Sequence, residues 1–198
     1  MTVGNASTSA APDPSDGTGF HRISQTLIYQ GRVFALHDEV YESPDGERFD
    51  RQIVRHSGAV AVVPLHEDGT VTLIRQYRPS VGRRLLEIPA GLLDVPGELH
   101  LEAARRELRE EAGYTAGSML ELCACVPAPG LADERVTIFL AKELTFVGTE
   151  LKGAEEQDIT YERVPLAACH AMIAAGSIID AKTSLALLMA ERNVATHG

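Results

Sequence analysis

The chain lacks the features that mark several common classes of protein. Its 198 residues carry a formal net charge of −10, whereas a general nucleic-acid binder presents a basic surface. No apolar run approaches the roughly 18 residues that span a bilayer. The first 19 residues lack the basic and apolar regions of a signal peptide. These absences argue against nucleic-acid and membrane partners and favour a cytoplasmic protein.

Cysteine is also scarce, with three residues at Cys123, Cys125 and Cys169. Cys123 and Cys125 stand two apart in a strand-like run, so they share a face but are poorly placed to bridge each other. An odd count without a dense framework is typical of reduced thiols in a cytoplasm. The seven histidines show no metal-ligand spacing with these cysteines.

The hydrophobic pattern predicts one α/β domain behind an extension. Residues 1–19 are rich in Ser, Pro, Gly and Asp and are expected to be a disordered tail. Strands are expected at 23–29, 33–42, 48–56, 58–65, 71–77, 85–89, 120–126, 135–141 and 159–164. Helices are expected within 91–114 and at about 166–175 and 180–193. The expected fold is an α/β sandwich, a mixed sheet with the first helix on one side and a C-terminal helix on the other.

The stretch from Gly91 to Tyr114 combines a glycine-led loop with a helix rich in carboxylates. At about 100° per residue, Glu107, Glu110 and Glu111 fall within an arc of about 100°. The apolar residues lie beside this arc, at Leu101, Ala104, Leu108 and Ala112. Glu107 and Glu111 therefore border the buried stripe, and a divalent cation is the natural counter-charge for carboxylates that repel one another. A solvated helix with ion pairs is the alternative.

The residues around these glutamates resemble the Nudix box, whose pattern is G-x5-E-x7-R-E-U-x-E-E-x-G-U, with U a bulky aliphatic residue. Gly91 and Glu98 are followed by Arg106-Glu107-Leu108, Glu110-Glu111 and Gly113-Tyr114, so every fixed letter is present. Six residues, instead of five, separate Gly91 from Glu98. Glu98 is therefore either a ligand or only a first-turn helix residue favoured by the helix dipole.

The resemblance extends from about residue 53 to residue 193, and over this range the chain is similar to ADP-ribose pyrophosphatases of actinobacterial type. It rests on RQYRP at 75–79, LLEIPAG at 85–91 and PAPG at 127–130. Pro129, sixteen residues after Gly113, stands where that subgroup has a specificity proline. The resemblance implies a Nudix-type α/β/α catalytic domain over 57–198. It also implies that the strands of 20–56 exchange between subunits of a homodimer.

The resemblance further implies a set of site residues. Metal ligands would be Glu107, Glu110, Glu111 and the carbonyl of Ala90, holding Mg²⁺ with Mn²⁺ as a substitute. Arg106 would orient this cluster. The general base would be Glu155 or its neighbour Glu156. Phosphate-binding candidates are Arg78, Arg55 and Arg75, and Glu87 lies in the same neighbourhood, facing metal or substrate.

The expected activity is metal-dependent hydrolysis of ADP-ribose to AMP and ribose 5-phosphate. One alternative is a Nudix hydrolase of another nucleoside diphosphate sugar, a dinucleotide or a CoA-type substrate. Another is a Nudix-like module that senses ADP-ribose without hydrolysing it, although such modules tend to lose the box glutamates. All of these take a small nucleotide-sugar type of ligand.

Overall fold

The structure, a computed structural model, describes residues 19–152 and 156–197. All but one residue of the tail expected at 1–19 lies outside the described residues. The chain divides into two compact units, which are treated separately below. The smaller contains the chain up to His56 together with Gly130–Asp133, and the larger contains Ser57–Pro129 and Glu134–Gly198.

The smaller unit is built on an antiparallel sheet of three strands in sequence order. These are β1 (His21–Gln30), β2 (Phe34–Glu42) and β3 (Arg48–His56), as the sequence predicts. The turn between β2 and β3 closes with a hydrogen bond from Gly46 N to Ser43 O of 2.9 Å. Gly46 has φ of 84°, a conformation that glycine adopts without strain.

A fully buried carboxylate, Glu39, ties this sheet together. Arg55 donates to both of its oxygens, at 2.5 and 2.6 Å, and Tyr41 and Gln25 donate to them as well. Burial alone would raise the pKa of Glu39, but these hydrogen bonds and the charges of Arg55 and Arg22 hold it below its usual value. Arg55 also donates to Asp133 at 3.1 Å, which fixes 130–133 to β3.

The larger unit contains two sheets. The first has the order β7 (Ala90–Leu92), β4 (Ala59–Pro64), β9 (Val136–Phe146) and β8 (Tyr114–Cys125), with β4 parallel to β9. The second has the order β10 (Thr160–Pro165), β5 (Thr70–Arg78) and β6 (Arg83–Glu87). The mixed strand directions are as expected, but the strands divide between two sheets where one was predicted.

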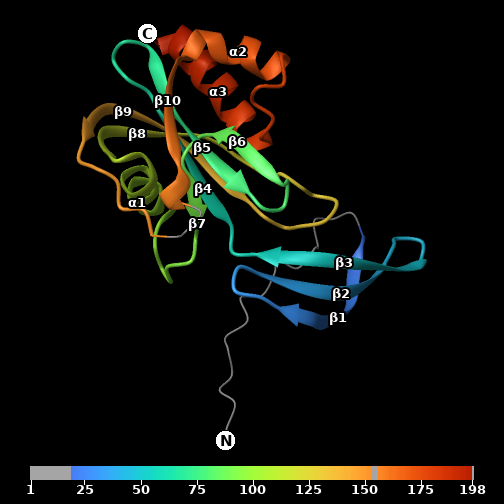
Figure 1. Cartoon of the computed structure of the whole chain (residues 1–198). Coiled ribbons are helices and arrows are strands. Elements are labelled where there is room, and N and C mark those ends of the chain that lie inside the picture. The colour runs from blue at the N-terminus through green and yellow to red at the C-terminus, as the bar shows by residue number, and fades with distance from the viewer. Residues whose placement is uncertain (1–18, 153–155, 198) are drawn as a thin grey trace, which may run out of the picture. The chain divides into compact units, whose positions relative to one another are not determined.

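The central strand β4 explains why helices cover both faces of the first sheet. Val60 and Val62 pack with α1 (His100–Ala112), whereas Ala61 and Val63 pack in the cluster that holds α2 (Leu166–Ala174) and α3 (Ala181–His197). A strand buried on both faces reads as a continuous apolar run. The α/β sandwich predicted from the sequence is confirmed, with α1 opposite the C-terminal helices (Figure 1).

Several element boundaries differ from the prediction. The short strand β7 was not predicted, β8 begins at Tyr114 instead of 120, and β9 continues to Phe146. Gly113 allows the early start of β8. Its left-handed conformation (φ 75°) ends α1, and the strand begins at the next residue. Leu101, expected in the buried stripe, is 37% exposed in the first turn of α1. No helix in the described part of the chain is long and apolar enough to cross a membrane.

Candidate active site

Three glutamates are buried on one face of α1. Glu107, Glu110 and Glu111 are each 7% exposed, although carboxylates are rarely so enclosed unless they are paired. The angular pattern predicts this position for Glu107 and Glu111, beside the apolar residues Leu108 and Ala112. The burial of Glu110 has another cause, which lies in the loop after β9.

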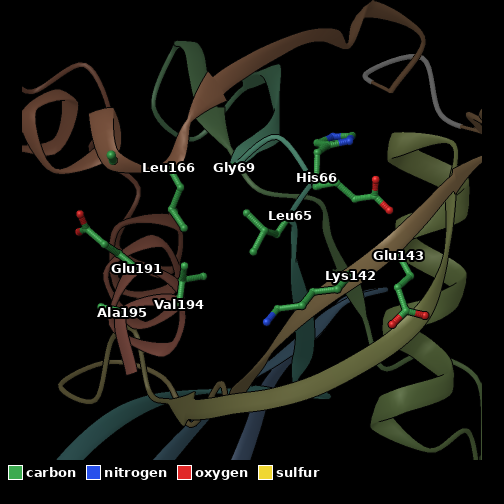
Figure 2. Close-up of a pocket in the computed structure, with 11 residues that line it drawn as sticks. Leu65, His66, Gly69, Lys142, Glu143, Leu166, Glu191, Val194 and Ala195 are labelled. Carbon is green, nitrogen blue, oxygen red and sulfur yellow. The ribbon is translucent and has the colours of Figure 1, made fainter. Parts of the chain in front are cut away.

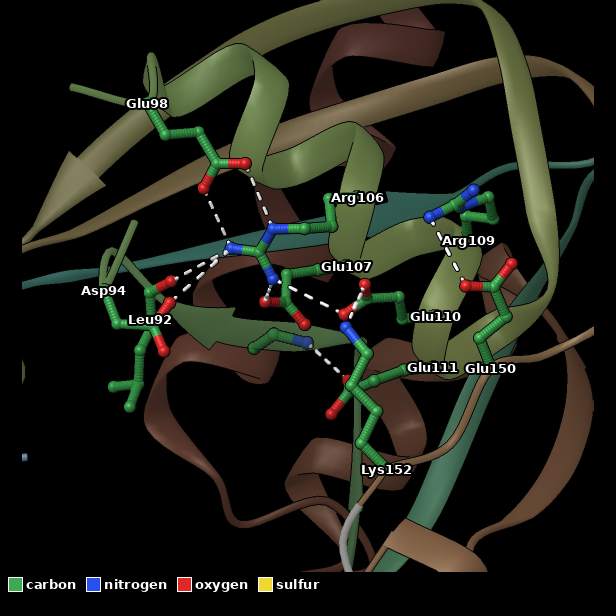
Figure 3. A network of polar contacts seen from close by, with 11 residues as sticks. Leu92, Asp94, Glu98, Arg106, Glu107, Arg109, Glu110, Glu111, Glu150 and Lys152 are labelled. Carbon is green, nitrogen blue, oxygen red and sulfur yellow. Dashed lines mark hydrogen bonds and ion pairs between the residues drawn. The ribbon is translucent and has the colours of Figure 1, made fainter. Parts of the chain in front are cut away.

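That loop lies across the C-terminal half of α1. The N–H of Glu150 donates to the carbonyl of Glu110 at 2.9 Å, and Lys152 forms an ion pair with the Glu110 carboxylate. Arg109 pairs with the Glu150 carboxylate at 3.4 Å (Figure 3). These contacts cover Glu110 from the outside, so a residue that helical geometry places away from the apolar stripe is buried as deeply as its neighbours.

Arg106 is the cation on which the site converges (Figure 3). Its Nε and Nη2 donate to the two carboxylate oxygens of Glu98 at 3.0 and 2.9 Å. Its Nη1 donates to Glu107 and, at 3.5 Å, to Glu110. The guanidinium therefore holds three carboxylates at once, consistent with the orienting role expected for Arg106.

Glu98 lies just before α1, which begins at His100, so it is not the first-turn helix residue considered as one alternative. Its hydrogen bonds from Arg106 hold the pKa of Glu98 below its usual value. The longer loop after Gly91 thus still brings Glu98 to the arginine of the box, where both of its oxygens accept from Arg106.

Strand β7 supplies the wall opposite the glutamates. A Cβ atom on Gly91 would lie 2.0 Å from Cδ of Glu107, so the carboxylate occupies the space that a side chain would need. The N–H of Ala90 donates to Oε2 of Glu111 at 2.9 Å. The box glycine therefore leaves the Glu107 carboxylate its present place against β7, and a side chain at position 91 would displace it.

These residues fit a hard divalent cation in their chemistry and placement. Carboxylate and carbonyl oxygens are the ligands that Mg²⁺ takes, and burial raises the pKa of Glu107 in the absence of such a charge. Among the described residues, no three acidic, histidine or cysteine side chains converge on one metal position. In Figure 3 the carboxylates of Glu107 and Glu110 point at Arg106 and Lys152, whereas Oε2 of Glu111 accepts from the N–H of Ala90.

Arg78 and Glu87 form a second polar group in the larger unit. Glu87 is 1% exposed and accepts from Arg78 Nε at 2.8 Å and from Nη2 at 2.7 Å. The hydrogen bonds of Glu87 raise the pKa of Arg78, and the charge of Glu111 adds to this effect. Arg78 thus lies within the field of the glutamate helix, whereas the carboxylate of Glu87 is turned to protein cations.

The other predicted substrate residues are placed differently. Arg75 and Arg78 are three residues apart on β5, so their side chains point to opposite faces of the sheet. Arg75 pairs at 2.7 Å with Glu162 on β10. Arg55 belongs to the smaller unit, where Glu39 and Asp133 take its hydrogen bonds. Pro129 is exposed in the turn after β8. Arg78 therefore interacts with the charge of Glu111, whereas Arg75 is turned to Glu162.

The candidate general bases fall at the edge of what the structure describes. Glu155 lies outside the described residues. Glu156 begins a short 3-10 helix (Glu156–Asp158), and of Glu156 only the backbone is described. Lys152 and Asp158 bracket these positions, and Lys152 contacts Glu110. Lys152, three residues before Glu155 in the sequence, therefore contacts the glutamate helix.

Sequence reasoning missed two lysines of this region. Lys152 pairs with Glu110, and Lys182 donates to Glu87 at 2.5 Å. Both partners are distant in the chain, so no local spacing indicates either contact. The signal that the sequence does offer is general: carboxylates that are expected to be buried need cations close to them. It does not indicate which residues supply those cations.

A separate pocket of about 610 Å³ opens elsewhere in the larger unit (Figure 2). Its walls are largely apolar, with Leu65, Leu166 and Val194, and its charged rim includes Lys142 and Glu191. None of the predicted site residues lines it. The chemistry predicted from the sequence therefore belongs to the α1 and β7 region and not to this pocket.

Comparison with known proteins places the chain in a family. The model of the NUDIX domain matches residues 55–184. An ADP-ribose pyrophosphatase of Mycobacterium tuberculosis is 41% identical over 162 residues, which are 81% of this chain and 78% of the relative. One of Bacillus subtilis is 36% identical over 165 residues, 83% of this chain and 89% of the relative.

A solved structure titled as that of an ADP compounds hydrolase agrees in fold. Its TM-score is 0.78 at 26% identity, and the match covers 90% of this chain and 96% of the other. The chain belongs to the Nudix family, as its box predicts. Nudix hydrolases generally use divalent metal ions, and three buried carboxylates lie on α1.

Proposed function

We propose that this protein hydrolyses ADP-ribose to AMP and ribose 5-phosphate with Mg²⁺. One observation carries the proposal: three glutamates are buried on the face of α1 that meets β7, in a chain closely related to ADP-ribose pyrophosphatases. A diphosphate ester repels hydroxide, so its hydrolysis needs a concentration of positive charge. Buried carboxylates that can hold metal ions supply the place for that charge.

The residues that would hold Mg²⁺ are Glu107, Glu110, Glu111 and the carbonyl of Ala90. Mg²⁺ supplies charge neutralisation and lowers the pKa of bound water. Gly91 keeps the wall of the site close, since it leaves room for the Glu107 carboxylate. Arg106 holds Glu98, Glu107 and Glu110 in one arrangement, so its role is to orient the ligands. Mn²⁺ is expected to replace Mg²⁺, because it takes the same oxygen ligands.

Arg78 is the phosphate-binding residue in this account. Two of its nitrogens are fixed by Glu87, and its side chain is 36% exposed, so part of the guanidinium remains accessible to an anion. A fork fixed on one edge and free on the other suits a phosphoryl group. Glu87 then acts through Arg78, in place of the direct contact with metal or substrate expected from the sequence.

The free thiols of all three cysteines support a cytoplasmic location.

Substrate preference and the Glu111→Gln variant test the proposal together. The wild-type protein should hydrolyse ADP-ribose in preference to other nucleoside diphosphate sugars, dinucleotides and nucleoside triphosphates. Glu111→Gln should lower kcat by about 100-fold or more, because it removes a metal ligand. Glu102→Gln, an exposed change on the same helix, serves as the control and should leave kcat within about twofold. Near wild-type activity of Glu111→Gln would refute the metal assignment, and no preference for ADP-ribose would refute the substrate.

A base that takes a proton from the attacking water is proposed at Glu155, with Glu156 as the alternative. Glu155→Gln should lower kcat by about 100-fold, within the range of general base catalysis, and change the binding of ADP-ribose much less. Glu156→Gln is the matched control one residue away. If Glu156→Gln has the large effect instead, Glu156 is the base, and if neither variant loses activity the base lies outside this pair.

We also propose that two copies of the chain associate through the smaller unit. Strand β1 exposes large apolar side chains that a stable surface would bury: Ile23, Leu27, Ile28 and Tyr29 are 47–56% exposed. Light scattering should give a mass of about twice 21.3 kDa. Leu27→Asp should shift this mass toward the monomer, whereas Leu120→Asp, at a similarly exposed leucine of β8, should not. A monomeric wild-type protein at assay concentration would contradict the proposal.

A further inference from the structure

Four charged groups form a linear network of hydrogen bonds in the larger unit, in the order Arg78, Glu87, Lys182 and Asp180. The carboxylate of Glu87 receives Arg78 Nε on Oε1, and on Oε2 it receives both Arg78 Nη2 and Lys182 Nζ. Lys182 Nζ also donates to Oδ2 of Asp180 at 2.9 Å. Lys182 is 15% exposed in its side chain and Glu87 is 1% exposed, so the bridge between them is well shielded from water.

The network is fixed to the backbone at the start of α3. Asp180 caps the helix, because its Oδ2 accepts from the N–H of Thr183 at 3.0 Å and from the Thr183 hydroxyl at 2.5 Å. The same hydroxyl oxygen accepts from the N–H of Ile88 at 3.1 Å. The residue after Glu87 in the chain is thus bound to the helix that carries Lys182, so Glu87 is held from both its side chain and its backbone.

The charges of this network balance as a set of two cations and two anions. Without Lys182, the carboxylates of Glu87 and Asp180 would share Arg78 as their one remaining cation in the network. The guanidinium would then be drawn toward them, because a buried carboxylate without a partner is costly. With Lys182 present, Glu87 needs only one edge of Arg78, and Nη1 of Arg78 makes no hydrogen bond to any residue within 19–152 and 156–197.

We infer that Lys182 is a positioning residue that acts through Glu87 to hold the free edge of Arg78 toward the diphosphate of the substrate. The inference rests on the proposed function, because it takes Arg78 as the phosphate-binding group. Lys182 does not touch the substrate. It shares Oε2 of Glu87 with Nη2 of Arg78, so it offsets part of the charge of Glu87 and leaves Arg78 held along one edge.

The test is the binding of ADP-ribose to the full-length protein in EDTA, measured by calorimetry so that no turnover occurs. Lys182→Met should weaken binding about tenfold, and Arg78→Gln should weaken it by at least as much. Adding Lys182→Met to Arg78→Gln should weaken binding no further, because the lysine acts through the arginine. Lys142→Met, at a lysine of β9 in the pocket of Figure 2, is the control and should bind as the wild type does.

Kinetics with Mg²⁺ separate positioning from a general loss of structure. The KM of Lys182→Met should rise by the same factor as its dissociation constant, with kcat changed by less than about threefold. Lys182→Arg keeps the charge and should recover most of the affinity. The double variant Glu87→Gln/Lys182→Met removes one charge of each sign, so it keeps the protein folded if Lys182→Met alone does not. It should still bind weakly, because Arg78 has lost its carboxylate.

Two results would overturn the inference. One is wild-type affinity in Lys182→Met, or in the double variant with Glu87→Gln. The other is an equal loss from Lys182→Met with and without Arg78→Gln, which would show that the lysine acts independently of the arginine. If Arg78→Gln binds weakly while Lys182→Met binds normally, only the role of Lys182 fails. If the wild-type protein neither binds ADP-ribose in EDTA nor hydrolyses it with Mg²⁺, the proposed function fails and this inference fails with it.

Discussion

Three like charges buried on one face of a helix require positive charge close by, and the structure around α1 is arranged to provide it. Arg106 reaches Glu98, Glu107 and Glu110 from within the helix, and Lys152 reaches Glu110 from the loop after β9. An unpaired buried carboxylate would cost several kcal/mol or take up a proton. These cations therefore stabilise a cluster of carboxylates that would otherwise be costly to bury.

Strand β4 positions the two helices that carry these charged residues. Because β4 is apolar on both faces, α1 and α3 can be packed on opposite sides of one sheet, each against its own cluster. α1 presents the glutamates toward β7, where Gly91 leaves room for them. α3 presents Lys182 toward Glu87, which in turn fixes Arg78. The sandwich thus carries the buried glutamates on the helix of one side, and Lys182, the partner of Glu87, on a helix of the other.

Much of this could be read from the sequence because it depends on local patterns. The continuous apolar run of β4 indicates a strand covered on both faces, and the spacing of Glu107 and Glu111 from Leu108 places them beside the buried stripe. The depth of Glu110 and the contact of Lys182 with Glu87 could not be predicted, since each depends on chain segments about 40 and 95 residues away. The three-residue strand β7 is too short for any periodicity to show it.

The central claim is that these carboxylates exchange their protein cations for a divalent metal ion. Anomalous diffraction from crystals of the full-length protein grown with Mn²⁺ tests it most directly. The account predicts Mn²⁺ roughly 2 Å from carboxylate oxygens of Glu107 and Glu111, with the carbonyl of Ala90 beside it and Lys152 displaced from Glu110. Crystals with Mn²⁺ bound elsewhere, and with Glu107 and Glu110 still paired to Arg106 and Lys152, would contradict it.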